Sequence, residues 1–354
     1  MTSADPHAVL LAGLCKALGD ARSPFAGSAL QPLADKGLAH HHVRLLGTGL
    51  LARVPKQSQM GLGAAANLAY EAACYERAAA SGHVPRVVAT LPPGAALPRG
   101  ALVVEEIIGR CARLPDDLPA IAEAFAALHS LPLPPAAERA PLIDAADPLL
   151  ALRAEIEAQA AYLAPAALPP GVRARVDAAL GQLSRLCVQA QRPPRRLIAF
   201  DGHPGNFLVR GDGRAILVDL EKARYSHPPL DLAHATLYTS TTWDLDSAAE
   251  LSTAQVLAFY EAWQQRCDIG SQLAAWFVPL RAAMWLWSVT WCAKWRVLSP
   301  RQSRRGTRGE DWSREHSSEA LIAHVRERVD CYLAAPAVER VLEELDELRA
   351  AFGR

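Results

Sequence analysis

The chain has 354 residues, of which 51% are hydrophobic and 21% charged, a composition that excludes a disordered or fibrous protein. Lysine and arginine together number 37, as do aspartate and glutamate, so the net charge is zero and no global positive field exists to bind nucleic acid. The length predicts two or three domains, or one large two-lobed domain.

Short strands around one helix are predicted for the first hundred or so residues. Two leucine-rich or β-branched runs flank Gly47-Thr48-Gly49, a pattern typical of a hairpin. Asn67 is a candidate N-cap and Gly82 a stop for a helix between them. In chain order we expect a helix at 10–18, a hairpin within 29–55, a helix at 67–81, and strands at 84–90 and 101–109.

After Gly109 the pattern becomes helical, with one interruption. Residues 197–223 indicate a strand, a polar loop, a second strand, a Gly-Asp-Gly turn and a third strand, which places the polar side chains at strand ends. An Arg/Ser-rich stretch at 299–318 is typical of a mobile loop. The helices expected in this part cover 118–130, 147–163 and 172–191, and further helices follow from residue 247.

Seven cysteines are spread along the chain without a CxxC pair, which favours reduced thiols in the cytoplasm over a disulfide framework or a zinc ribbon. The first residues have no basic region before their short apolar run, so we expect no secretory signal. Residues 273–293 are apolar enough to imitate a membrane span, but Pro279 and Arg281 interrupt them. We therefore expect a buried helix there and no membrane partner.

The interrupting segment carries the strongest chemical signal. Asp201 is followed by Asn206 across Gly-His-Pro-Gly, and Asp219 ends the apolar run Ala-Ile-Leu-Val. Phosphoryl transfer from a nucleotide needs an aspartate at the attacking hydroxyl, together with an amide oxygen and a carboxylate to hold Mg²⁺. The spacing supplies these groups in the order used by kinases. A surface turn is the alternative, because Asp, Gly, Pro and Asn are common turn residues.

At these residues the sequence resembles the aminoglycoside phosphotransferase and choline kinase superfamily. That family's signature is approximately HGDxHPGNxL, a strand ending in an IDxE motif, and DxxxDLA; here these are AFDGHPGNFL, VDLEKA and SHPPLDLA. The likeness covers about residues 35 to 240. It implies an α+β, two-lobed protein-kinase-like fold with a small N-terminal antiparallel sheet plus helix and a larger, mainly helical C-lobe. The implied domains are a nucleotide-binding lobe at 1–104, a hinge at 105–109, and a catalytic and acceptor-binding lobe at 110–354.

The resemblance implies roles for residues of the C-lobe. Asp201 would be the catalytic aspartate, Asn206 a metal-binding amide and Asp219 the main metal carboxylate. Glu221 would assist the metal or face the substrate, and a solvated turn residue is the alternative. Asp231 would brace the catalytic loop through hydrogen bonds, and His203 would order that loop without transferring a proton.

In the N-lobe the resemblance implies that Arg53 contacts the nucleotide phosphates. Lys56 is the rival, although it follows Pro55 and is expected to leave the strand. Glu71 would pair with the basic residue, and an ordinary solvent-facing helix glutamate is the alternative. Of the hinge residues, Glu105, Glu106 and Ile107 would contact adenine through their backbone.

The sequence departs from the family pattern in two places. Ala199 and Phe200 replace the histidine and glycine before the catalytic aspartate, which puts the rigidity of the loop in doubt. No GxGxxG occurs, and the segment around His40-His41-His42 takes the phosphate-loop position. Adjacent histidines rarely converge on a metal, so a solvated or phosphate-facing loop is expected there.

The acceptor end is less defined. Asp244, Asp246 and Glu250 follow the DLA motif and would attract a cationic acceptor, or form a solvated loop. Five tryptophans between residues 276 and 295 have helical spacing, and we expect most of them in the core with one near the pocket.

The resemblance therefore implies an ATP- and Mg²⁺-dependent phosphotransferase acting on a hydroxyl of a small molecule such as an aminoglycoside, amino alcohol or sugar. The alternatives are a choline/ethanolamine-type kinase and a catalytically silent nucleotide-binding pseudokinase. The Arg-rich segment at 301–314 is the only sequence feature that suggests nucleic-acid binding, and a lid over the acceptor is the alternative role for it.

Overall fold

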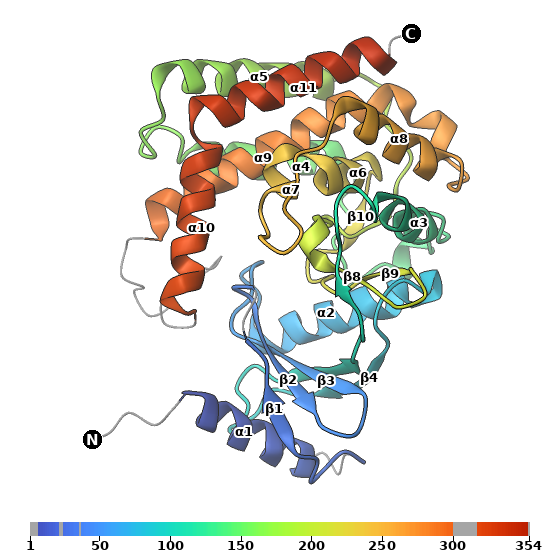
Figure 1. Ribbon diagram of the computed structural model, residues 1–354, viewed down its shortest axis with the longest axis vertical. Coiled ribbons are helices and arrows are strands. Elements are labelled where there is room, and N and C mark those ends of the chain that lie inside the picture. Colours follow the sequence, from blue (N-terminus) through green and yellow to red (C-terminus); the bar gives the residue numbers. More distant parts are fainter. Residues whose placement is uncertain (1–5, 21–23, 35–36, 300–316, 353–354) are drawn as a thin grey trace. The chain divides into compact units, whose positions relative to one another are not determined.

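The computed structural model describes residues 6–20, 24–34, 37–299 and 317–352 (Figure 1). The chain divides into two compact units, each described here by itself. The first comprises the described residues of Met1–Glu76, Pro85–Ile107 and Gln302–His324; the second comprises those of Arg77–Val84, Ile108–Arg301 and Val325–Arg354.

The first unit is built on a five-stranded antiparallel sheet. Its order is β1-β2-β3-β5-β4, with β1 Leu30–Pro32, β2 His40–Leu45, β3 Leu50–Pro55, β4 Val87–Leu91 and β5 Ala101–Glu105. Helix α1, Pro6–Asp20, buries Leu14 and Leu18 in the same apolar cluster as Val43 and Val103 of the sheet. Alternate strand residues thus form a core under α1, because successive side chains of a strand point to opposite faces.

The predicted hairpin is confirmed as β2 and β3. Leu45 lies opposite Leu50, and Gly47 and Gly49 between them have φ values of 76° and 69°. Glycine adopts this left-handed conformation without steric cost, and a tight turn between twisted strands requires it. The turn fixes the register that places His40 and His42 on β2 and Arg53 on β3.

Helix α2 begins earlier than predicted, at Ala64, and ends at Ala78. Asn67 is therefore not the N-cap. It lies inside the helix, where its side-chain Nδ2 donates to Glu71 Oε1 one turn later at 2.6 Å. A short 3₁₀ turn at Ala79–Ser81 follows, and Gly82 ends it with a φ of 69°, as the sequence predicts for a stop.

The second unit holds two small sheets among helices. The interrupting segment forms the predicted strands β7 Arg196–Ile198, β8 Phe207–Val209 and β9 Ala215–Leu217. Strand β8 pairs with β9 and with β6 (Arg110–Cys111), and β7 pairs with β10 (Arg224–Ser226), all antiparallel. Because β8 and β9 are only three residues long, the loops at their ends are held close together.

Helices make up most of the second unit. The predicted helix at 273–293 is found as α9, buried along most of its length, and it begins only at Phe277 because two 3₁₀ turns precede it. Helices α4, α5, α6 and α11 contact it.

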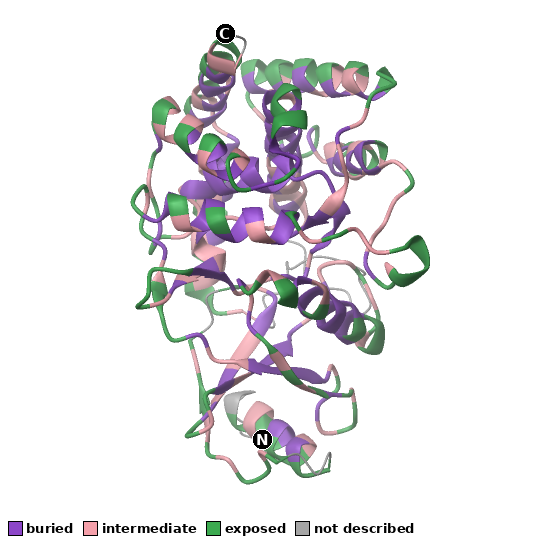
Figure 2. Cartoon of the chain, turned by 90° about the vertical axis from the view of Figure 1, so that its right-hand side faces the viewer, coloured by how far each residue is buried: buried purple, intermediate pink, exposed green. Residues whose placement is uncertain are grey.

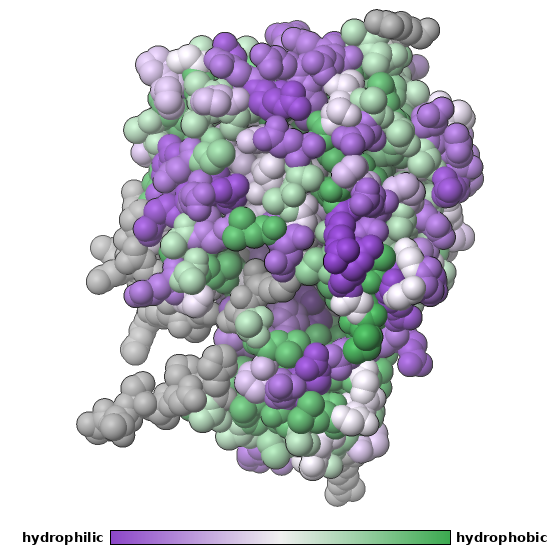
Figure 3. Space-filling view, in the orientation of Figure 1, coloured by the Kyte–Doolittle hydropathy of each residue, from purple (hydrophilic) through white to green (hydrophobic). Residues whose placement is uncertain are grey.

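The outer helices of this unit are amphipathic. Figure 2 shows buried and exposed residues on opposite faces of these helices, and Figure 3 shows hydrophilic side chains over α5 and α11. The helices are α3 Leu118–His129, α4 Pro148–Ala160, α5 Pro170–Val188, α6 Pro229–Thr236, α7 Tyr238–Thr241, α8 Thr253–Gln264, α9 Phe277–Leu298, α10 Glu319–Tyr332, which crosses the unit boundary, and α11 Ala335–Phe352.

A buried ion pair joins α9 to α11. Arg281 Nε donates to Glu344 Oε1 at 2.7 Å, and the Arg281 side chain is 1% exposed. The same guanidinium donates to the hydroxyl and the carbonyl oxygen of Thr236, the last residue of α6, at 2.7 and 2.9 Å. The C-terminal helix is thereby fixed to the helix that carries Asp231.

The sheet-plus-helix unit followed by a mainly helical remainder confirms the predicted fold class. Among the helices that the structure describes, none has both the length and the apolar character needed to cross a membrane. The Arg-rich segment at 301–314, for which nucleic-acid binding and a lid were the two interpretations, lies outside the described residues.

Candidate functional site

The loop after β7 is held by a buried carboxylate. Asp231 of α6 accepts hydrogen bonds from the backbone N–H of Ala199 and of Phe200, both at 2.7 Å, and its side chain is 0% exposed. These bonds fix the two residues before Asp201, so Asp231 has the bracing position that the sequence predicts. The loop keeps a defined backbone although alanine and phenylalanine replace the family's histidine and glycine.

His129 of α3 supports Asp231 in a defined tautomer. The indole Nε1–H of Trp263 can only donate, and it lies 3.1 Å from His129 Nδ1, so this nitrogen is the acceptor. The proton of the neutral ring is therefore on Nε2, which donates to Asp231 Oδ2 at 3.0 Å. A chain of hydrogen bonds thus runs from the core to the loop that carries Asp201.

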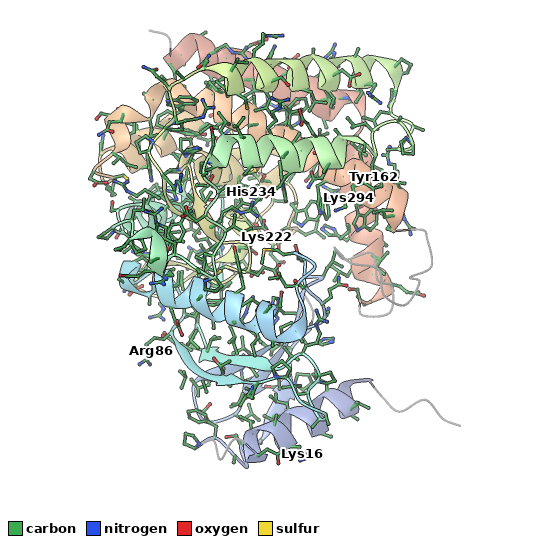
Figure 4. The ribbon with its side chains drawn as sticks, turned by 180° about the vertical axis from the view of Figure 1, so that it is seen from behind. Lys16, Arg86, Tyr162, Lys222, His234 and Lys294 are labelled. Carbon is green, nitrogen blue, oxygen red and sulfur yellow. The ribbon has the colours of Figure 1, made fainter. Side chains whose placement is uncertain are left out.

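Asp201 lies between a lysine and a histidine. Lys222 Nζ is 2.8 Å from Asp201 Oδ2, and His234 Nδ1 is 3.7 Å from Oδ1 (Figure 4 labels both residues). Burial alone would raise the pKa of the carboxyl, but the Lys222 ammonium and the His234 and His203 imidazoles outweigh it and hold the pKa of Asp201 well below its ordinary value. Asp201 is therefore a carboxylate at neutral pH.

Asn206 and Asp219 lie at the same end of the β8–β9 pair. The backbone N–H of Val218 donates to the carbonyl oxygen of Asn206 at 2.9 Å, which places Asp219 one residue from that bond. The Asn206 side chain donates from Nδ2 to the backbone oxygen of Asp201 at 2.8 Å, and this orients its Oδ1 as an acceptor. Glu221 is held nearby, since its N–H lies 3.5 Å from Asp219 Oδ1.

An amide oxygen and two carboxylates at one end of a short strand pair are the kind of oxygen ligands that Mg²⁺ takes in nucleotide sites. The donor set of Asn206, Asp219 and Glu221 fits this ion, and Glu221 is buried with 6% exposure, where a carboxylate needs a cation or donors.

A wall of aromatic and charged side chains lies beside Asp201. The Trp287 ring packs edge-on against Phe200 at a centroid distance of 5.2 Å, and Lys222 Nζ lies 5.6 Å from the Trp287 centroid. Glu155 of α4 accepts from Trp287 Nε1 at 3.3 Å and from Arg224 at 2.6 Å. The tryptophan expectation is confirmed in outline: Trp276, Trp285, Trp287 and Trp295 are buried, and Trp287 is near the catalytic loop.

The acidic loop after α7, which carries Asp244 and Asp246, packs against the catalytic loop. A Cβ added to Gly205 would lie 2.7 Å from Asp244 Cβ, so only glycine permits this approach. Asp244 Oδ1 accepts the N–H of Asp246 at 2.8 Å, and Asp246 Oδ2 lies 3.7 Å from the Cys111 thiol.

In the first unit, His40 joins the helix to the strands. His40 Nε2 is 2.9 Å from Glu71 Oε2, and its Nδ1 is 3.4 Å from an Arg53 nitrogen. A second Arg53 nitrogen is 3.4 Å from His42 Nε2. The expectation of a solvated loop here is wrong for His40, which is 2% exposed on strand β2, because the strand register turns it inward toward Glu71. That Arg53 pairs directly with Glu71 stays a prediction.

Lys56 follows the end of β3, as predicted, and its ammonium donates to the carbonyl oxygen of Gly37 at 3.2 Å. At the predicted hinge, the N–H of Glu105 donates to Arg86 O at 2.8 Å and that of Glu106 to Gly49 O at 2.9 Å. These two amides are therefore used within the first unit. Ile107 comes next in the chain and is 9% exposed.

The model of the phosphotransferase enzyme family matches residues 34–269, which is about two thirds of the chain. This range includes the candidate site residues from His40 to Trp263. The chain belongs to the phosphotransferase enzyme family. A search among curated proteins gave no significant match.

Solved structures share the fold of this phosphotransferase. A choline/ethanolamine kinase family protein from Mesorhizobium loti matches with a TM-score of 0.54 at 21% identity, over 93% of this chain and 99% of that one. Ethanolamine kinase from Plasmodium vivax matches with a TM-score of 0.57 at 12% identity, over 88% and 84%. The GDP complex of aminoglycoside 2'-phosphotransferase-IIIa matches with a TM-score of 0.55 at 16% identity, over 90% and 98%.

Three residues of the candidate site are not identified by the sequence analysis. Lys222 follows Glu221 directly, and His234 comes three residues after Asp231 on the same helix. Both lie beside motif residues, so their charged or imidazole side chains were a signal that the sequence offered. Glu155 has no local signal, because only the packing of α4 against α9 brings it to Trp287.

Proposed function

We propose that this phosphotransferase moves the γ-phosphate of ATP to a hydroxyl of a small molecule, with Mg²⁺ as the metal. The observation that supports this most strongly is the arrangement of Asp201, Asn206 and Asp219. One hydrogen bond joins the Asn206 amide to the Asp201 backbone, and another joins Asn206 to the residue before Asp219. An ordinary surface turn has no need to unite these three groups.

Asn206 Oδ1, Asp219 and Glu221 would hold the metal. When bound, Mg²⁺ neutralises charge on the nucleotide phosphates and polarises the bond that breaks. The hydrogen bond from Asn206 Nδ2 to Asp201 O keeps the amide oxygen available as a ligand, and a change of that residue would disturb the catalytic loop as well.

Asp201 would orient the acceptor hydroxyl and receive its proton. The hydroxyl oxygen forms a bond to the γ-phosphorus, the bond from that phosphorus to the β,γ-bridging oxygen breaks, and the hydroxyl proton passes to Asp201. Because the pKa of Asp201 is held low, its carboxylate is a weak base, and the proton moves late, when the forming P–O bond has acidified it.

In the first unit, Arg53 would contact the phosphates. Its guanidinium is oriented by the imidazoles of His42 and His40, and His40 is in turn held by Glu71. Ile107 would offer its backbone N–H to the base, because the N–H groups of Glu105 and Glu106 are used within the sheet and its turn. The backbone carbonyl oxygen of Glu105 is the second candidate contact. Lys56, which donates to the carbonyl oxygen of Gly37, would be a further contact of the phosphates.

The experiment is a transfer assay with ATP or GTP, with and without Mg²⁺, against aminoglycosides, amino alcohols, sugars and nucleosides. Mass spectrometry of the acceptor would show whether it gains one phosphoryl group. We expect Mg²⁺-dependent transfer to one class of acceptor, with ATP as the donor. Absence of nucleotide binding in the presence of Mg²⁺ would contradict the proposal, whereas nucleotide binding without transfer to any acceptor or to water would favour a pseudokinase.

A further inference from the structure

The charge nearest to the catalytic aspartate is that of Lys222. Its Nζ lies 2.8 Å from Asp201 Oδ2, while the side chains are 14% and 21% exposed. An acceptor hydroxyl must come within about 2.6–3.2 Å of the same carboxylate to pass its proton. The reacting hydroxyl therefore binds beside an ammonium group that belongs to the protein.

The position of Lys222 is defined by several neighbours. Its Nζ lies 5.6 Å from the Trp287 centroid, a distance at which the ring face attracts a cation. Trp287 is in turn fixed by its hydrogen bond to Glu155 and by edge-on packing against Phe200. The phenylalanine that replaces the family's glycine is thus part of the wall that positions Lys222.

Two further carboxylates near this wall, those of Glu155 and Asp244, have partners other than Lys222. Glu155 accepts from Arg224 at 2.6 Å, and the Arg224 guanidinium lies 3.7 Å from the Phe200 centroid. Asp244 accepts a backbone N–H of its own loop at 2.8 Å. Farther along α9, Lys294 shares a face with Trp287 and Trp291, since these residues are spaced by four and three (Figure 4 labels Lys294).

We propose that Lys222 determines the charge class of the acceptor, so that this site phosphorylates an uncharged or anionic hydroxyl compound, such as a sugar or sugar acid, in preference to one with an ammonium group beside the hydroxyl. The proposal rests on the phosphotransferase function proposed above. In an amino alcohol, and at the neighbouring hydroxyls of an amino sugar, the ammonium is two carbons from the reacting oxygen. It would lie close to Lys222 in a partly buried site, where like charges repel, and it would compete with Lys222 for the same Asp201 carboxylate.

A matched series of sugars tests the proposal. Glucosamine, glucose and glucuronate share one ring and differ in charge, and choline with its uncharged isostere 3,3-dimethyl-1-butanol forms a second pair. We expect kcat/KM of the wild-type chain to favour the uncharged or anionic member by at least about tenfold. In Lys222→Met this preference should fall to about one or reverse, and Lys222→Arg should retain it because the positive charge remains.

Lys16→Met is the control, because Lys16 lies on α1 with a 62% exposed side chain and pairs with the exposed Asp20 one turn along that helix. If none of the sugars is phosphorylated, the same series is tested for inhibition of Mg²⁺-dependent ATP hydrolysis, where glucosamine should inhibit least. Wild-type preference for the ammonium member, an unchanged preference in Lys222→Met, or an equal loss of kcat for every acceptor would overturn the proposal. ATP binding is measured separately, and its absence would overturn the proposed function itself.

Discussion

Phe200 illustrates how a departure from a family motif is accommodated at one residue. It has a φ of 63°, a left-handed conformation that disfavours side chains, yet it is 1% exposed and packs against Trp287 and Arg224. Its N–H is held by Asp231 at 2.7 Å. The packing of the ring and this hydrogen bond outweigh the backbone strain.

Phe200→Gly should therefore destabilise the protein although it relieves the strain. Removal of a buried phenylalanine costs about 3–5 kcal/mol, and relief of a left-handed residue returns about 1–2 kcal/mol, so a net loss of about 1–4 kcal/mol is expected. Urea unfolding measures it. Ala167, exposed with a φ of 53°, is the matched control: Ala167→Gly should be neutral or stabilising by up to about 1 kcal/mol. A stabilised Phe200→Gly variant would contradict this account.

Asp231→Asn tests the bracing of the catalytic loop. The amide can accept with one oxygen only, and its NH₂ would face a backbone N–H or His129 Nε2–H, all of them buried. We expect a loss of about 2–4 kcal/mol in the free energy of unfolding and a fall in kcat with little change in the Kd of ATP. Unchanged stability would show that the loop is held by other contacts.

The sequence allows the positions of Asp201, Asn206 and Asp219 to be predicted because their spacing is fixed by two short strands and one turn. Lys222 and Glu155 could not be assigned in the same way. The contact of Lys222 with Asp201 depends on the path of the chain after Asp219, and that of Glu155 with Trp287 depends on how two helices pack.

At the scale of elements, strand and helix positions were predictable from periodicity, whereas helix ends were less so. Helix α2 begins at Ala64, three residues before the predicted N-cap, because the small residues before Asn67 have high helix propensity and the Asn67 amide is used by Glu71. The inward position of His40 was not predictable from the three adjacent histidines. It depends on the register between β2 and β3, in which His42 lies opposite Arg53 and His40 opposite Pro55.

The ion pair between α9 and α11 gives a test at this scale. Arg281→Met leaves Glu344 buried without its guanidinium partner, and we expect a loss of about 3–5 kcal/mol. The double change Arg281→Met with Glu344→Leu should recover most of it, because no unpaired charge remains. Chemical unfolding of both single variants and the double variant measures the coupling, and additive effects in the double variant would contradict the pairing.

At the scale of the whole molecule, buried histidines make stability depend on pH. Burial lowers the pKa of His227 from 6.5 to about 4 and that of His234 from 6.5 to about 4. Between these values the unfolded chain binds protons that the folded chain does not. The stabilisation is therefore complete above pH 6.5 and is lost as the pH falls toward 4.

We expect the free energy of unfolding to fall between pH 7 and pH 5 by about 2 kcal/mol for each of these two histidines. In His227→Asn, which cannot titrate in this range, the fall should be smaller by about that amount. Urea unfolding at both pH values measures it. An identical pH dependence in the variant would show that His227 does not contribute to it.

We propose above that Asp201 orients the acceptor hydroxyl and receives its proton during phosphoryl transfer from a Mg²⁺-bound nucleotide. The most direct test of this role compares Asp201→Asn with the wild-type chain. Asp212→Asn, an exposed turn residue between β8 and β9, is the matched control. We expect Asp201→Asn to lower kcat by about 10²–10⁴-fold with the Kd of ATP changed little, and Asp212→Asn to leave both unchanged. Transfer by Asp201→Asn at the wild-type rate would contradict the account.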